Sequence, residues 1–292
     1  MKRILENDFL KVTIDDHGAE LVSIYDKEKD REVIWQADPK FWNRHSPVLF
    51  PNVGRHFQNL YRYNGREYTS KQHGFARDMD FTCIDSTPDS VTHQIRSTEE
   101  TLKDYPFDFV LRIRHILKGR TLTVSWKVAN NTEGDMYFTI GGHPGFNVPV
   151  LPDTKRSDYL LTFDGQDSLT HLLVDYDTGT VKADSAKVLP LENGTCRIDD
   201  HMFDLDALVF DNQVTRVGIA LPDGSPYVEL RCEGFPCLGI WSAASDAPFV
   251  CLEPWMGRCD NYGFTGDLSE KPFINHLKMD EMFETAYTIE VF

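Results

Sequence analysis

Apolar and polar residues alternate along much of this 292-residue chain. The clearest run spans 107–130, where the turn Lys118-Gly119 separates two apolar series of period two: Leu111, Ile113, His115 and Leu117, then Leu122, Val124, Trp126 and Val128. This period predicts antiparallel strands with one face on a core and the other in water. His115 falls in the apolar register, so we interpret it as a core histidine rather than a functional one.

Shorter runs of strand character continue on both sides of this segment. They lie at 9–14, 19–25, 33–35, 61–63, 67–69, 79–84, 91–97, 136–140, 159–163, 169–174, 207–210, 217–221, 227–231, 238–242, 249–252 and 286–292. Asn64-Gly65 predicts a hairpin turn, and only 38–44 and 99–104 are candidates for short helices. Many short strands and little helix predict an all-β fold of the sandwich or barrel class. Without a Pro/Gly/Ser-rich linker, we expect one domain over residues 1–292.

Composition narrows the class of partner. The formal net charge is −16 and the isoelectric point is near 5.0, which argues against nucleic acid or an anionic membrane as a partner. The six cysteines form no CxxC pair, so we interpret them as reduced thiols of a cytoplasmic protein. The first residues lack the apolar stretch of a secretory signal, and no run reaches transmembrane length. A small neutral ligand, or a phosphorylated one held by a local group of arginines, fits these totals.

The stretch Gly141-Gly142-His143-Pro144-Gly145 ends the strand-like run at 136–140. The glycines allow a sharp turn and a close approach of the backbone, and the proline favours an extended His143. His143 is therefore placed at a strand end on a rigid turn, as in many sites for small polar ligands. A half-buried histidine of an ordinary tight turn fits the same residues.

Three further loops are dense in polar groups, at 45–55, 71–78 and 251–260. Glu253 follows the apolar run 249–252 and precedes Pro254-Trp255, so desolvation is expected to raise its pKa and make it a proton acceptor. A surface glutamate that simply ends a strand is the alternative. Pooled, the loops offer the groups a sugar needs, namely hydrogen-bonding side chains and aromatic rings: His73, His143, Glu253, Arg55, Arg77, Trp35, Phe146 and Trp255.

In these motifs the chain resembles the aldose 1-epimerases (mutarotases) of the galactose mutarotase-like fold, and among them the LacX-like branch. The resemblance covers nearly the whole chain and rests on five short motifs in order, with a sixth near the end: Gly18-Ala19-Glu20-Leu21, Pro51-Asn52-Val53-Gly54-Arg55, His73-Gly74-Phe75-Ala76-Arg77, Gly142-His143-Pro144-Gly145-Phe146, Leu252-Glu253-Pro254-Trp255 and Gly266-Asp267-Leu268.

The resemblance implies a β-supersandwich with a shallow sugar cleft and neither metal nor organic cofactor. It assigns Glu253 as the base that takes the O1 proton and His143 as the acid that protonates the ring oxygen O5. His73 and Arg55 would bind hydroxyls beside them. The family also uses an aspartate, for which Asp206 is the best match, with Asp204 and Asp211 as alternatives.

The His73-Gly74-Phe75-Ala76-Arg77 motif departs from the His-Gly-Gly of classical galactose mutarotases and is closer to hexose-6-phosphate mutarotases. Arg77, with Arg44, is thus a candidate phosphate ligand, although an ion pair with Asp78 or Asp80 is an equal alternative. We expect a sugar partner, either a free aldohexose or its 6-phosphate, and a monomer or homodimer.

Three other functions are alternatives to epimerisation. A non-catalytic carbohydrate-binding or sugar-sensing protein with the same cleft is the main alternative. A glycoside hydrolase would need two carboxylates across the bond, and only Glu253 is a strong candidate. A metal enzyme based on His73, His143 and Glu253 lacks supporting spacing.

Overall fold

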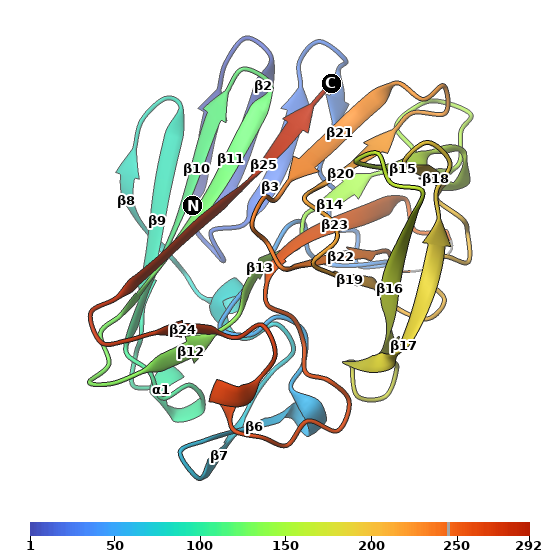
Figure 1. Ribbon diagram of the computed structural model, residues 1–292. Coiled ribbons are helices and arrows are strands. Elements are labelled where there is room, and N and C mark those ends of the chain that lie inside the picture. Colours follow the sequence, from blue (N-terminus) through green and yellow to red (C-terminus); the bar gives the residue numbers. More distant parts are fainter. Residues whose placement is uncertain (244–245) are drawn as a thin grey trace.

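Antiparallel β-sheets dominate the computed structural model, which describes residues 1–243 and 246–292. The nine-stranded sheet consists, in spatial order, of β18 (Thr195–Arg197), β15 (Leu160–Phe163), β20 (Arg216–Ala220), β21 (Pro226–Arg231), β25 (Met282–Val291), β11 (Thr121–Asn130), β10 (Phe109–Lys118), β9 (Ser90–Arg96) and β8 (Thr82–Ser86). The blue strands β2 and β3 lie behind its left half in Figure 1. They belong to a four-stranded sheet of β1 (Lys2–Glu6), β2 (Leu10–Asp15), β3 (Leu21–Asp26) and β4 (Arg31–Glu32).

An eight-stranded sheet crosses the right half of the molecule and carries the site described below (Figure 1). Its order is β17 (Thr180–Pro190), β16 (Ser168–Asp175), β19 (Leu208–Asp211), β22 (Cys237–Trp241), β23 (Phe249–Met256), β13 (Ile140–Gly142) and β5 (Val48–Leu49), and β14 (Gly145–Asn147) also pairs with β23. Two two-stranded sheets complete the strands: the hairpin of β6 (Leu60–Tyr63) and β7 (Arg66–Thr69), and the pair of β12 (Met136–Phe138) with β24 (Asn275–Leu277), which are distant in the chain.

Helical structure in the described residues is confined to short segments: α1 (Thr101–Asp104) and the 3₁₀ turns η1 (Phe57–Asn59), η2 (Ala76–Asp78), η3 (Arg156–Asp158) and η4 (Leu268–Glu270). None of the helices in the described residues is long and apolar enough to cross a membrane. The predicted all-β class, the Asn64-Gly65 hairpin and the short helix at 99–104 are confirmed.

The alternating pattern produces the core directly. In β11 every second side chain is buried, from Leu122 to Asn130, and β10 pairs with it so that His115 lies opposite Val124. His115 is 2% exposed and its Nδ1 has no hydrogen-bond partner. The prediction of a core histidine is therefore confirmed, and burial lowers its pKa to about 3.

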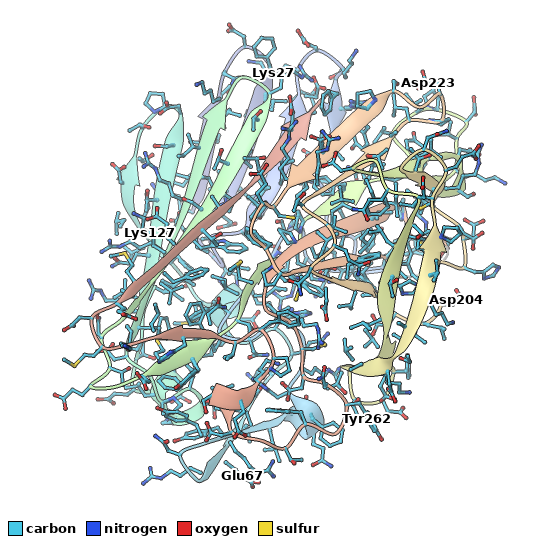
Figure 2. All side chains as sticks on the ribbon, viewed as in Figure 1. Lys27, Glu67, Lys127, Asp204, Asp223 and Tyr262 are labelled. Carbon is cyan, nitrogen blue, oxygen red and sulfur yellow. The ribbon has the colours of Figure 1, made fainter. Side chains whose placement is uncertain are left out.

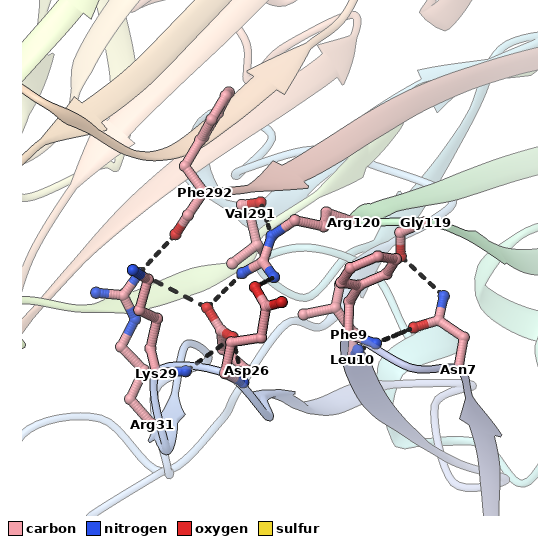
Figure 3. A network of polar contacts seen from close by, with 11 residues as sticks. Asn7, Phe9, Leu10, Asp26, Lys29, Arg31, Gly119, Arg120, Val291 and Phe292 are labelled. Carbon is pink, nitrogen blue, oxygen red and sulfur yellow. Dashed lines mark hydrogen bonds and ion pairs between the residues drawn. The ribbon is translucent and has the colours of Figure 1, made fainter.

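A buried carboxylate joins the N-terminal sheet to the C-terminal strand (Figure 3). Asp26, at the end of β3, is fully buried and accepts a hydrogen bond from Nη2 of Arg120 at 2.5 Å. Arg120 also donates to the carbonyl of Val291, and Arg31 donates to that of Phe292, each at 2.8 Å. Because Asp26 would be costly to bury alone, these charged partners fix the two sheets against each other.

Several element predictions were wrong in detail. Residues 38–44 contain a single hydrogen-bonded turn rather than a helix: the Asp38 carbonyl accepts from the amides of Phe41 and Trp42 at 3.0 Å each, and the Asp38 side chain caps this turn by accepting from the amide of Lys40. Of 33–35 only Ile34 pairs, in one bridge with Phe146. β8 starts at Thr82, later than the predicted 79, and β1 and β17 were missed. Glu253 does not end its strand, because β23 continues to Met256 with neighbours on both sides.

Candidate active site

A cleft of about 900 Å³ lies over the eight-stranded sheet and brings together most of the predicted site residues. Glu253, His143, His73, Arg55, Arg77, Asp206 and Trp255 all line it. Its sides differ in charge, with Arg44, Arg55 and Arg77 from one group of loops and Asp177, Asp200, Asp204 and Asp206 from another. Figure 2 shows Asp204 beside the β16–β17 hairpin at the right of the molecule.

The carboxylate of Glu253 and the imidazole of His143 meet at the floor of this cleft. Oε2 of Glu253 lies 3.2 Å from Nε2 of His143, and the two residues are 1% and 7% exposed. Glu253 stands in the middle of β23 opposite Gly239 of β22, whereas His143 directly follows β13 on the other side of β23. The glycines beside His143 are required for this packing, since a Cβ on Gly142 would lie 2.8 Å from the hydroxyl of Tyr287.

Burial moves both members of this pair toward their neutral forms. It raises the pKa of Glu253 well above its ordinary value, and the negative charge of Asp206 adds to this effect. It lowers the pKa of His143 to about 3, with a smaller contribution from the positive charges of Arg77 and Arg44. The pair therefore holds one proton over a wide pH range, and this proton can pass between two atoms in contact.

Aromatic rings enclose the His143 imidazole. Trp42 stacks on it with centroids 4.7 Å apart, and Trp241 and His73 approach edge-on at 5.7 Å and 5.6 Å. These rings exclude water, and the face of an indole attracts an imidazolium charge. Sequence reasoning missed both tryptophans because neither lies in a glycine-rich or polar motif.

Hydrogen bonds to the backbone of Gly54 fix the orientation of His73. The Gly54 amide donates to Nδ1 of His73 at 3.0 Å, and the His73 amide donates to the Gly54 carbonyl at 2.8 Å. Burial lowers the pKa of His73 well below its ordinary value. With Nδ1 accepting, the neutral ring carries its proton on Nε2, so His73 is a hydrogen-bond donor rather than a base.

Arg44, Arg55 and Arg77 form one side of the cleft, the arginine wall, and its positive charge is only partly neutralised. Arg44 pairs with Asp78 at 2.7 Å, so Asp78 is not the partner of Arg77, and Asp80 pairs with His17. Arg77 donates from Nη2 to the Gln72 carbonyl at 2.8 Å, while its buried Nε has no partner. Burial, together with the like charge of Arg44, lowers the pKa of Arg77 to about 10. A guanidinium in this state favours an anionic ligand.

The three candidate aspartates separate clearly. Asp211 is turned toward Arg258, with both carboxylate oxygens 3.0 Å from its Nε, and does not line the cleft. Asp204 lines the cleft but bonds to His201 at 2.9 Å. Asp206 lines it close enough to raise the pKa of Glu253, and its backbone has a positive φ of 76°. Asp206 is thus the one of the three aspartates whose negative charge acts on Glu253.

The aromatic expectations hold only in part. Trp255 lines the cleft, but it is 5% exposed, and its ring fills the space above Gly141 and Gly239, where a Cβ would approach it within 2.5 Å and 2.4 Å. Trp35 and Phe146 are buried and do not line the cleft, because Trp35 stacks on Phe249 instead. Trp42 and Trp241 take the place expected for them.

Potential metal ligands also converge here, though not in the combination considered from the sequence. Among the described residues the group consists of His143, Cys251 and Glu253, without His73.

The antiparallel layers and the carboxylate–imidazole pair in a polar cleft define a mutarotase-like protein. Residues 2–258 match the sequence profile described as aldose 1-epimerase, and the chain belongs to that family. Its relatives include the chromosomal LacX protein of Lactococcus lactis subsp. lactis, 30% identical over 98% of each chain.

Solved structures show the same fold. A galactose mutarotase related enzyme from Lactobacillus acidophilus superimposes with a TM-score of 0.94 at 33% identity, covering 100% of this chain and 97% of that one. A galactose mutarotase-like protein from Lactobacillus casei gives 0.91 at 30% identity over 100% of both chains. The predicted family and fold are confirmed.

Proposed function

We propose that this chain is an aldose 1-epimerase that interconverts the α and β anomers of a hexose by acid–base ring opening and closure. The observation that carries the proposal is the 3.2 Å contact between His143 and Glu253, both buried at the floor of a polar cleft. Opening a pyranose requires one group to accept the O1 proton while another donates to O5. Both oxygens are bonded to the same carbon, so two adjacent proton carriers can serve them.

In the proposed reaction, Glu253 accepts the proton from the O1 hydroxyl and His143 donates its proton to O5. The C1–O5 bond breaks as the C1–O1 carbonyl forms. Rotation about C1–C2 presents the other carbonyl face, and the reverse transfers close the ring as the second anomer. The reactive form, carboxylate with imidazolium, contains the same single proton as the neutral pair, so no proton is needed from solvent. Each such acid or base contributes a rate factor of about 10²–10⁴.

The surrounding residues have supporting roles in this proposal. His73, with its proton on Nε2, and Arg55 donate hydrogen bonds to hydroxyls and to the developing charge at O5. Asp206, on the opposite side of the cleft, accepts hydrogen bonds from sugar hydroxyls. Trp42 stabilises the imidazolium by its stacked ring face, and Trp42 and Trp241 together keep water away from it.

The arginine wall favours a hexose 6-phosphate over the free hexose. Arg77 has a buried Nε without a partner, and Arg44 and Arg55 line the same cleft. A phosphate supplies the acceptor oxygens that a guanidinium fork can bind in pairs. A free hexose has no anionic group to accept from the unpartnered Nε of Arg77.

The test is anomeric exchange measured by NMR for galactose, glucose and their 6-phosphates. Wild type is expected to accelerate exchange above buffer, and Glu253→Gln to remove the acceleration. Arg77→Gln should raise KM for the 6-phosphates about tenfold or more, the loss expected for a bidentate charged contact, and leave the free sugars unchanged. Arg62→Gln is the control, because Arg62 pairs with Glu67 on the β6–β7 hairpin.

Binding of a sugar without acceleration of its exchange would refute the enzyme and favour the non-catalytic carbohydrate-binding alternative. Equal effects of Arg77→Gln on free and phosphorylated sugars would refute the phosphate assignment alone.

A further inference from the structure

Three donor atoms, a nitrogen, a sulfur and an oxygen, converge at the floor of the cleft. A ring nitrogen of His143, the sulfur of Cys251 and a carboxylate oxygen of Glu253 lie within 4.8 Å of one another. The strand explains the arrangement, because residues two apart in β23 point to the same face. His143 reaches the group from the turn between β13 and β14, and Gly145, the first residue of β14, pairs directly with Cys251.

These distances suit a tetrahedral ion such as Zn²⁺. Bonds of about 2.0–2.3 Å to nitrogen, oxygen and sulfur place such ligands about 3.3–3.7 Å apart. The 3.2 Å between His143 and Glu253 is already close to this spacing. Since all three atoms lie within 4.8 Å, a side-chain rotation of Cys251 and small adjustments of the others can complete the set.

We propose that His143, Cys251 and Glu253 form a binding site for a thiophilic divalent cation of the zinc class, and that the bound ion inhibits the enzyme. Three protein ligands leave the fourth position for water on the cleft side, where His143 and Glu253 line the wall. A hard ion such as Mg²⁺ prefers oxygen ligands and octahedral geometry, so it does not fit this donor set.

Binding and acid–base chemistry exclude each other at this site. The ion displaces the thiol proton of Cys251 and the proton shared by His143 and Glu253, and both protons go to solvent. Neither catalytic group can then exchange a proton with a sugar. Inhibition rests on the proposed epimerase function, whereas metal binding rests only on the positions of the three side chains.

Cys251 separates the two properties. It is fully buried and does not line the cleft, so it has no contact through which to take part in ring opening. Its removal should weaken inhibition by the metal and leave the metal-free rate intact. Cys259 provides a matched control, because it is also buried and lines the same cleft but does not belong to the ligand group.

The experiment uses the full chain, reduced and freed of metal, as wild type, Cys251→Ser, Cys251→Ala and Cys259→Ser. Zn²⁺ is titrated by calorimetry, and Cd²⁺ by its ultraviolet thiolate-to-metal charge-transfer band. Wild type and Cys259→Ser should each bind one ion per chain at this site and show the charge-transfer band. The Cys251 variants should lack the band. Zn²⁺ should inhibit wild-type mutarotation, and a chelator should reverse the inhibition.

Loss of one ligand should weaken inhibition by Zn²⁺ about tenfold or more, while Mg²⁺ has no effect on any variant. Equal zinc sensitivity of wild type and the Cys251 variants, or loss of the cadmium band in Cys259→Ser only, would overturn the site. If no sugar proves to be a substrate, the calorimetric and cadmium measurements still decide on metal binding, so the two proposals fail separately. The metal site would also be overturned if Glu253→Gln bound Zn²⁺ as tightly as wild type does.

Discussion

Replacing Glu253 by Gln separates the energetic effect of the buried pair from its chemistry. The substitution keeps the shape of the side chain and removes its titration. In the wild type, burial holds the pKa of Glu253 well above the ordinary value of 4.5 and that of His143 at about 3 instead of 6.5. The two shifts have opposite consequences for the pH dependence of stability.

The signs follow from which state binds more protons. Between 4.5 and its folded pKa, Glu253 is protonated only in the folded state, so the free energy of unfolding falls by about 1.4 kcal/mol per pH unit. Between about 3 and 6.5, His143 is protonated only in the unfolded state, so stability rises with pH at the same slope. Above 4.5 the two slopes cancel for as long as folded Glu253 keeps its proton and unfolded His143 is protonated. Above 6.5 the histidine slope ends, and any pH range left below the folded pKa of Glu253 shows only falling stability.

In Glu253→Gln only the histidine contribution remains. Relative to wild type, the variant should gain about 1.4 kcal/mol of unfolding free energy for each pH unit above about 4.5, for as long as folded Glu253 keeps its proton. Over the same range its mutarotation should be slower by about 10²–10⁴-fold. A more stable but inactive protein at neutral pH is the expected result.

Urea unfolding of both proteins at several pH values from 5 to 8 measures the difference, and NMR exchange measures the rate. Glu284→Gln, which removes an exposed partner of Lys127, should show neither effect. A stability difference between wild type and Glu253→Gln that does not change with pH would show that Glu253 is ionised in the fold. Full activity of Glu253→Gln would refute its role as the base.

Three other outcomes follow from particular side chains. Between pH 7.5 and 5, wild type should lose about 2 kcal/mol of unfolding free energy because His115 becomes protonated only in the unfolded state. His115→Leu should remove this loss, as urea titrations at the two pH values can check. Gly74→Ala should unfold the protein or greatly reduce its activity, since its Cβ would lie 2.2 Å from the Phe50 carbonyl oxygen. Gly65 also has a positive φ but lies in open space, so Gly65→Ala should cost only about 1–2 kcal/mol of unfolding free energy in thermal or urea melts. Trp42→Leu should let water reach His143, raise its pKa and move the acid limb of the pH–rate profile to higher pH; an unchanged limb would show that the stacking does not shield the ring.

The strands were predictable where the pattern was local. The period of two in β10 and β11 reflects burial on one face, so it placed His115 in the core without reference to any other segment. β17 was missed because only its first two residues, Thr180 and Val181, are buried, and the nine that follow show no regular apolar alternation. For residues 38–44, the local signal predicted a helix, but only one turn forms, capped by the Asp38 side chain.

For the site, the sequence determined which residue types stand on which turns: His143 after two glycines, His73 before Gly74, and Glu253 beside Trp255. The tertiary structure alone decided the environment of each side chain. β13 and β22 flank β23 on both sides and desolvate Glu253, and Trp42 stacks on His143. Asp211 pairs with Arg258 and therefore does not take part in the cleft. The order of residues specifies local conformation, but desolvation and charge pairing depend on neighbours distant in the chain, and these set the pKa values on which the proposed chemistry rests.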